Sequence, residues 1–341
     1  MDEIKDWTFL SCAVVCLIAD VYLAVGLRGR AEDRSLQMLI LAFAAKAVSL
    51  TLSAPTVATF IDQIVGVPNV NALVVHLLGG VVYSTGMLVA LSYWAYPVER
   101  AQRRAIIWIV LSVIMSGVLI DMWLAATNTV TARSGRYLLD NLELPSVAVY
   151  LLLYIASFVA GLLGVLLTCL RYARVATGAW LRRGLYVSAF GASVYLLYCV
   201  HRVVGVMLPG LRADFPDIEL ATPLCVGVGA LLIVVGFTLP SWGIKLSAAA
   251  LWWRDYRNHL ALYPLWSSLY RQVPTIALDP PRSRWADCLR VRDVRYHLCR
   301  RVVEIQDARL SLQADGGLSV PAGQPRLADE VAWLVHMSRS T

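Results

Sequence analysis

The sequence predicts an all-α integral membrane protein with seven transmembrane helices and a small helical cytoplasmic domain at its C-terminal end. Three observations lead to this prediction: seven long apolar stretches, arginines concentrated in alternate loops, and an amphipathic composition after the last stretch. Hydrophobic residues make up 58% of the chain, and its mean hydropathy is +0.63. Both values lie well outside the usual range of soluble domains.

Each apolar stretch has the length that a membrane-crossing helix needs. The hydrocarbon core of a bilayer is about 30 Å thick, so ~20 helical residues cross it. Short polar loops separate one stretch from the next. We therefore expect helices to cross the membrane at residues 8–27, 35–54, 71–95, 105–126, 146–169, 183–208 and 220–240.

The basic residues predict the orientation of these helices. Three alternate loops hold most of the arginines near the membrane: Arg28, Arg30, Arg34, Arg100, Arg103, Arg104, Arg171, Arg174, Arg182 and Arg183. Short loops rich in Lys and Arg stay in the cytoplasm, so the N-terminus should lie outside and the C-terminus inside. Because arginine far outnumbers lysine, as in GC-rich genomes, we expect a bacterial plasma membrane. The bilayer accounts for the net charge of +7 better than nucleic acid does.

The residues after the last stretch change in character. We divide the chain into a seven-helix bundle, residues 1–244, and an amphipathic helical tail domain, residues 245–341. Tryptophans and basic residues from 241 onward predict a separate helix along the inner interface of the membrane. A further helix is predicted at 292–312. Its apolar stripe has steps of four, four and three residues: Val294, Leu298, Val302 and Ile305.

Ionisable residues inside membrane helices are energetically costly, so they are candidate ligand-binding or coupling residues. The sequence places six of them within the predicted spans: Asp20, Lys46, His76, Asp121, His201 and Arg202. Asp121 and Arg202 are expected to pair at the outer side, close to the two histidines. Asp20 and Lys46 form a second possible pair. Each pair either holds two helices together or contributes to a site for a small ligand or a proton.

No pattern of catalytic or metal-binding residues is present in the sequence. The chain lacks HExxH, GxSxG and the P-loop motif GxxxxGK[ST], and its cysteines show no metal-ligand spacing. We therefore expect neither an enzyme nor a protein with a metal or cofactor.

Two tail segments carry a resemblance to a known family. They are LWWRDYRNHLALYPLWSSLYRQVPTIALDPP (251–281) and DVRYHLCRRVVEIQDARLSL (293–312). With them, the chain resembles an actinobacterial family of multi-pass membrane proteins that are labelled putative transporters and have an uncharacterised C-terminal domain. The label implies transport. The genes of this family tend to accompany helix-turn-helix regulators and metallopeptidase-like partners, which implies signalling.

Two functions therefore remain open. The first is a receptor-like regulator that senses a small molecule or the state of the membrane and docks a cytosolic regulatory protein, of the helix-turn-helix type, on residues 245–341. The alternative is a secondary transporter of a small molecule. Seven spans without an internal repeat cannot divide into equal inverted halves, which favours the regulator. Truncation of the tail should abolish only the signalling function.

Overall fold

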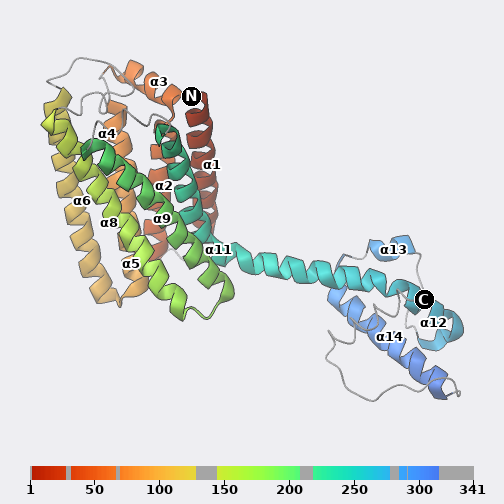
Figure 1. The fold of residues 1–341 in the computed structure, drawn as a ribbon. Helices are drawn as coiled ribbons and strands as arrows, with labels where there is room; N and C mark the ends of the chain where they lie inside the picture. The colour runs from red at the N-terminus through yellow and green to blue at the C-terminus, as the bar shows by residue number, and fades with distance from the viewer. Residues whose placement is uncertain are drawn as a thin grey trace. The chain divides into compact units, whose positions relative to one another are not determined.

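The structure, a computed structural model, is helical throughout its described residues (Figure 1). It describes residues 2–27, 32–66, 70–127, 144–207, 218–276, 284–289 and 291–314. These residues contain no strand, and seven of their helices are long and apolar enough to cross a membrane. The predicted class, an all-α polytopic membrane protein, is confirmed.

The helices of the membrane-spanning part match the predicted stretches in order. A π-helical turn, η1, lies inside the third span. The elements are α1 (Asp2–Leu27), α2 (Arg34–Leu52), α4 (Val70–His76) with η1 (Leu77–Val82) and α5 (Tyr83–Ala95), α6 (Val98–Thr127), α8 (Pro145–Val175), α9 (Ala179–Met207) and α11 (Ile218–Ala261).

A short helix that the sequence analysis did not predict, α3 (Pro55–Val65), occupies most of the second loop. Proline is favoured in the first turn of a helix because its missing N–H would have no partner there. The backbone N–H and the hydroxyl of Thr56 both donate to Asp6 Oδ1, over 3.2 Å and 3.1 Å. These bonds fix the start of α3 to α1.

The chain divides into two compact units, Met1–Ser241 and Trp242–Thr341, close to the predicted division after residue 244. Helix α11 crosses this division without interruption, so it contributes residues to both units. The prediction of a separate helix from 241 onward is therefore wrong. Between Trp242 and Leu251 the only helix-disfavouring residue is Gly243, and three consecutive alanines follow it.

The outer surface of the first unit is apolar, as expected for a surface that contacts lipid. Helix α6 exposes Ile106, Val113 and Ile114, and Phe190 on α9 is 63% exposed. Soluble monomers rarely show such continuous apolar surface. Because lipid offers no hydrogen-bonding partner, a helix that satisfies its own backbone groups is one of the few structures that can carry these side chains across a bilayer.

Four glycines bring the backbones of α9 and α11 into direct contact. A Cβ atom at Gly184 would lie 2.5 Å from the carbonyl oxygen of Gly236, and one at Gly191 would lie 2.9 Å from that of Gly229. The reciprocal contacts are equally close, at 2.6 Å and 3.1 Å. Small residues allow such approach between membrane helices. We call these four residues the glycine seam; it fixes the membrane-spanning part of α11 against α9.

The second unit has a small core of its own, formed after α11 by α12 (Tyr263–Gln272), η2 (Pro274–Ile276), α13 (Arg284–Cys288) and α14 (Val294–Ala314). The predicted stripe on α14 is buried at all four positions. The hydrophobic core of the second unit consists of Leu262, Trp266, Leu269, Leu298, Val302, Ile305 and Ala308. The sequence also predicts a short final helix at 328–338, which lies outside the described residues.

Candidate functional site

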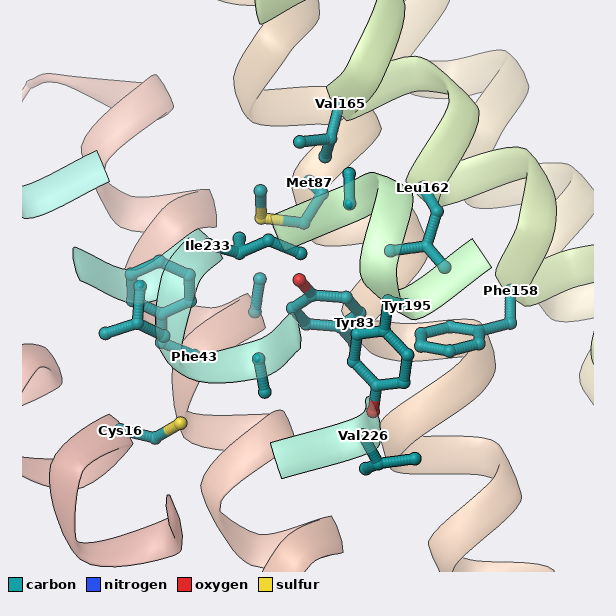
Figure 2. Close-up of a cluster of buried hydrophobic side chains, with 14 of the residues drawn as sticks. Cys16, Phe43, Tyr83, Met87, Phe158, Leu162, Val165, Tyr195, Val226 and Ile233 are labelled. Carbon is teal, nitrogen blue, oxygen red and sulfur yellow. The ribbon is translucent and has the colours of Figure 1, made fainter. Parts of the chain in front are cut away.

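The buried lysine of the membrane unit lies among aromatic rings. Lys46, on α2, is 5% exposed. Its ammonium nitrogen is 4.8 Å from the ring centre of Tyr195, 4.9 Å from that of Phe158 and 5.3 Å from that of Tyr83. Figure 2 shows these three rings side by side in the core. The negative faces of the rings attract a cation at these distances. We call Lys46 and the three rings the lysine cage.

Helix packing explains why the cage forms at this place. Tyr83 begins α5 directly after the π-helical turn, Phe158 lies on α8 and Tyr195 on α9. A Cβ atom at Gly80, inside the turn, would lie 2.5 Å from Tyr154, and one at Gly79 would collide with the side chain of Ser49. The two glycines thus let the third span approach α2 and α8 closely. Single π-helical turns often occur at functional sites.

His76 precedes this turn and contacts two tyrosines of α8. Its Nδ1 lies 2.8 Å from the hydroxyl of Tyr150, and its ring stacks on Tyr154 with the centres 4.0 Å apart. Tyr154 stacks in turn on Phe158 at 6.3 Å. The histidine is therefore joined to the lysine cage through aromatic contacts.

A second series of contacts joins the cage to Arg202. Tyr195 packs edge-on against Phe158, with centres 4.7 Å apart, and against Tyr198 at 5.9 Å. The guanidinium of Arg202 lies 5.6 Å from the ring centre of Tyr198. Three of the six predicted residues, Lys46, His76 and Arg202, thus belong to one aromatic cluster built from four spans.

The other three predicted residues are Asp121, His201 and Asp20, and the described residues show no ring contact or ion pair that places Asp121 or Asp20 in this cluster. Asp121 is exposed on α6, and His201 is half-buried on α9. Asp20 is half-buried on α1, and its Oδ1 has no hydrogen-bond partner among the described residues. The expected Asp20–Lys46 and Asp121–Arg202 ion pairs are likewise not formed there. Both cations instead lie over aromatic rings.

The membrane cluster combines positive charge with aromatic rings. It holds two cations and a histidine, but the described residues show no carboxylate beside Lys46. An unpaired ammonium inside a bilayer is costly, and three π faces offset only part of that cost. Within the described residues, no group of His, Cys, Asp or Glu is arranged to hold a metal ion.

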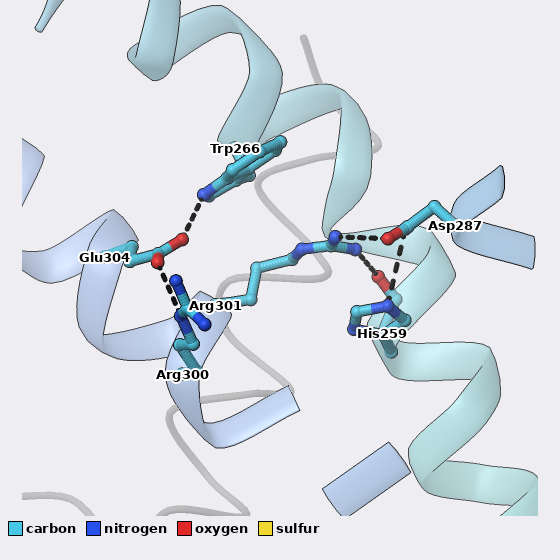
Figure 3. Close-up of polar contacts among 6 residues, drawn as sticks. All are labelled: His259, Trp266, Asp287, Arg300, Arg301 and Glu304. Atoms are coloured by element: carbon cyan, nitrogen blue, oxygen red, sulfur yellow. Dashed lines mark hydrogen bonds and ion pairs between the residues drawn. The ribbon is translucent and has the colours of Figure 1, made fainter. Parts of the chain in front are cut away.

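The tail unit contains a second buried polar cluster (Figure 3). Arg301 is 6% exposed and donates to the carbonyl of His259 over 2.6 Å and to Oδ1 of Asp287 over 3.0 Å. Nε2 of His259 lies 3.3 Å from Oδ2 of Asp287. The guanidinium also lies 5.1 Å from the ring centre of Trp266. We call Arg301, Asp287 and His259 the tail triad.

The tail triad joins α11, α13 and α14. Burial of the Asp287 carboxyl by itself raises its pKa, but the neighbouring side chains of His259 and Arg301 outweigh this effect and hold the pKa of Asp287 well below its usual range. A neighbouring network is similar: Trp266 Nε1 donates to Glu304 over 2.7 Å, and Arg300 Nε donates to the same carboxylate over 3.0 Å.

Sequence reasoning found the charged residues of the membrane cluster and missed its aromatic ones. The available signal was the spacing of Tyr150, Tyr154 and Phe158, which recur every four residues and so share one face of α8. In an apolar span this pattern is hard to distinguish from ordinary packing. The tail triad was missed because Asp287 and Arg301 come together only through the fold of α13 against α14.

The fold and these clusters define a class: a polytopic helical membrane protein with a folded C-terminal tail. In the tail of this chain, residues 251–315 match a family model described as a family of unknown function (DUF6545). This match covers the end of α11 and every later described helix. Neither a curated protein nor a solved structure matches the chain.

Proposed function

We propose that the protein is a receptor-like regulator that senses a small molecule or the state of the membrane with its seven-helix bundle and signals through its tail. The observation that carries this proposal is the continuity of α11 from Ile218 to Ala261. The same helix holds two residues of the glycine seam and, nearer its end, His259 of the tail triad. A displacement of α11 in the bundle therefore acts on the tail through one continuous helix, which contains Pro240.

Different contacts hold the two ends of α11, and this arrangement suits the transmission of a displacement from the bundle to the tail. In the bundle, backbone contacts at the glycine seam oppose small adjustments of α11 against α9, because neither backbone can yield. In the tail, the carbonyl of His259 accepts from Arg301, so the helix end is bonded directly to α14. Coupling between the bundle and the tail needs a structural element whose position both of them can change, and α11 is such an element.

The lysine cage supplies the sensing end. Lys46 contacts rings from α5, α8 and α9, and α9 contacts α11 at the glycine seam. A ligand that binds the ammonium, or a change that moves it, alters the packing of helices adjoining α11. The tail then presents its helices to a cytosolic regulatory protein, of the helix-turn-helix type by family resemblance. In this proposal the N-terminus lies outside a bacterial plasma membrane and the tail lies inside.

Replacing Lys46 with Met tests the proposal in the full chain, reconstituted in lipid nanodiscs. Methionine has a similar shape and removes the charge, and loss of a buried, poorly compensated charge leaves the bundle folded. We expect amide hydrogen exchange in α12 and α14 to change at least about fivefold, because allosteric coupling energies have this magnitude. Lys46→Arg, which keeps the charge, should have a smaller effect.

Val113→Met is the matched control, because Val113 is 67% exposed on α6, which contributes no residue to the cage. If Lys46→Met leaves exchange in the tail at the wild-type level, the bundle and the tail are independent and the regulator proposal fails.

A secondary transporter is the second candidate, favoured by one observation. The buried Lys46 and the unpartnered Oδ1 of Asp20 are ionisable groups inside membrane helices, where coupling sites of transporters occur. In proteoliposomes a transporter should lose flux when Lys46 is replaced by Met and keep it when the tail is removed after residue 244. A regulator should show the opposite dependence on the tail.

A further inference from the structure

Helix α14 exposes an apolar stripe on the side opposite the tail core. Its residues are Tyr296, Val303 and Leu310, which are 60%, 56% and 61% exposed. They recur every seven residues, so they form one line along the helix, as in the contact seam of a helix pair. The core residues Leu298 and Ile305 lie on the other side. An exposed apolar face of this kind on a folded helix is a candidate contact surface.

The charges beside this stripe indicate what the second partner is. Arg300 and Asp307 lie seven residues apart, so they share one flank of the stripe. If two copies of α14 pair antiparallel about Val303, Tyr296 of one copy faces Leu310 of the other. Arg300 of each copy then lies beside Asp307 of the other, so the attraction occurs twice. In a parallel pair, Arg300 and Asp307 of one copy would lie on the side of the interface opposite to those of the other copy, so this attraction would not form.

We propose that a second copy of this chain docks on α14, through an antiparallel pair centred on Val303. Such a contact is isologous, because the same surface meets itself across a two-fold axis. The stripe is short, but two copies held in one membrane meet at a high effective concentration, which raises the stability of a small contact. The fork of five N–H donors on a guanidinium serves both Glu304 of its own helix and a carboxylate of the second copy.

Disulfide crosslinking of the full chain in its native membrane tests this pairing. In a background that carries Cys299→Ser, Val303→Cys places a thiol on the two-fold axis. We expect mild oxidation to convert most of this variant to a covalent dimer. Ser311→Cys, exposed on the same helix but away from the stripe, should remain a monomer. A variant with Val303→Cys that stays monomeric, while its thiol still reacts with a soluble maleimide, would overturn the proposal.

Two further variants determine the direction of the pair. Tyr296→Cys and Leu310→Cys should each crosslink poorly alone and efficiently when the two chains are co-expressed. Efficient crosslinking of Tyr296→Cys with itself would mean a parallel pair and would overturn the antiparallel arrangement.

With Val303→Cys, the additional change Asp307→Arg should lower the dimer yield several-fold, whereas Asp307→Asn should lower it less. Equal yields for both would remove the electrostatic basis of the proposal.

Discussion

Replacing Arg301 with Met will destabilise the tail unit by about 3–5 kcal/mol. This is the range for breaking a buried ion pair when one charge stays behind without its partner. Arg301 is 6% exposed and binds both the carboxylate of Asp287 and the carbonyl of His259, so its loss leaves two buried acceptors without a donor. We expect hydrogen exchange at α14 amides to rise steeply in the full chain.

Arg295→Met is the matched control, because Arg295 lies on the same helix and is exposed. It should leave exchange near the wild-type rate. The double change Arg301→Met with Asp287→Leu should recover part of the lost stability, since replacing both members of a buried pair by apolar groups is often tolerated. If Arg301→Met were as stable as the control, the tail triad would not contribute to the fold.

The stability of the tail should also depend on pH through Asp287. Its pKa in the folded tail lies well below its usual range, whereas the unfolded value is about 3.9. The contribution of Asp287 is therefore fully present above the unfolded pKa, and it is lost as the pH falls toward the folded one. Exchange at α14 should show this loss between about pH 5 and lower values. The Asp287→Asn variant should lack this part of the pH dependence.

Replacing Gly236 with Leu will give the largest loss of stability in the membrane unit. A Cβ atom there would lie 2.6 Å from the carbonyl oxygen of Gly184 and would collide with Ser188, and backbone atoms cannot rotate away. Overpacking usually costs about 1–3 kcal/mol, and a backbone clash lies at the upper end of this range. We expect a marked fall in the midpoint temperature of unfolding in detergent.

Gly117→Leu provides the control for this variant. Gly117 lies on α6 and is exposed, and a Cβ atom there would meet nothing within 4 Å. Its variant should unfold near the wild-type temperature. Equal midpoints for Gly236→Leu and Gly117→Leu would show that the α9–α11 contact is not close in solution.

The fold could be predicted because membrane helices depend on simple properties of the chain. A run such as 105–126 is almost entirely apolar, and in lipid a helix satisfies its backbone groups within the segment itself. The end of the seventh helix could not be predicted in the same way. From Trp242 onward, tryptophans and basic residues resemble an interfacial segment, whereas the alanines at 248–250 continue the helix to Ala261. Composition alone does not separate these two outcomes.

The candidate site was predictable in its charges and not in its contacts. Lys46 and Arg202 stand out because charges are rare in membrane helices. Their expected partners were carboxylates, since opposite charges usually pair. The structure places aromatic rings beside both cations instead, and this depends on how α5, α8 and α9 are rotated about their axes. Helix rotation is set by tertiary packing, including the glycine contacts of the π-helical turn.

The central claim is that α11 carries a change from the lysine cage to the tail. It is tested most directly by measuring hydrogen exchange in the tail after the helical stability of α11 has been lowered. The link is weakened by changing Ala248, Ala249 and Ala250 to Gly, which costs about 1 kcal/mol per residue in a helix. Exchange at α12 and α14 is then compared for Lys46→Met with and without the three glycines. Our account predicts that Lys46→Met alters exchange in the tail only when the alanines are present. An equal effect in both backgrounds, or no effect in either, would contradict it.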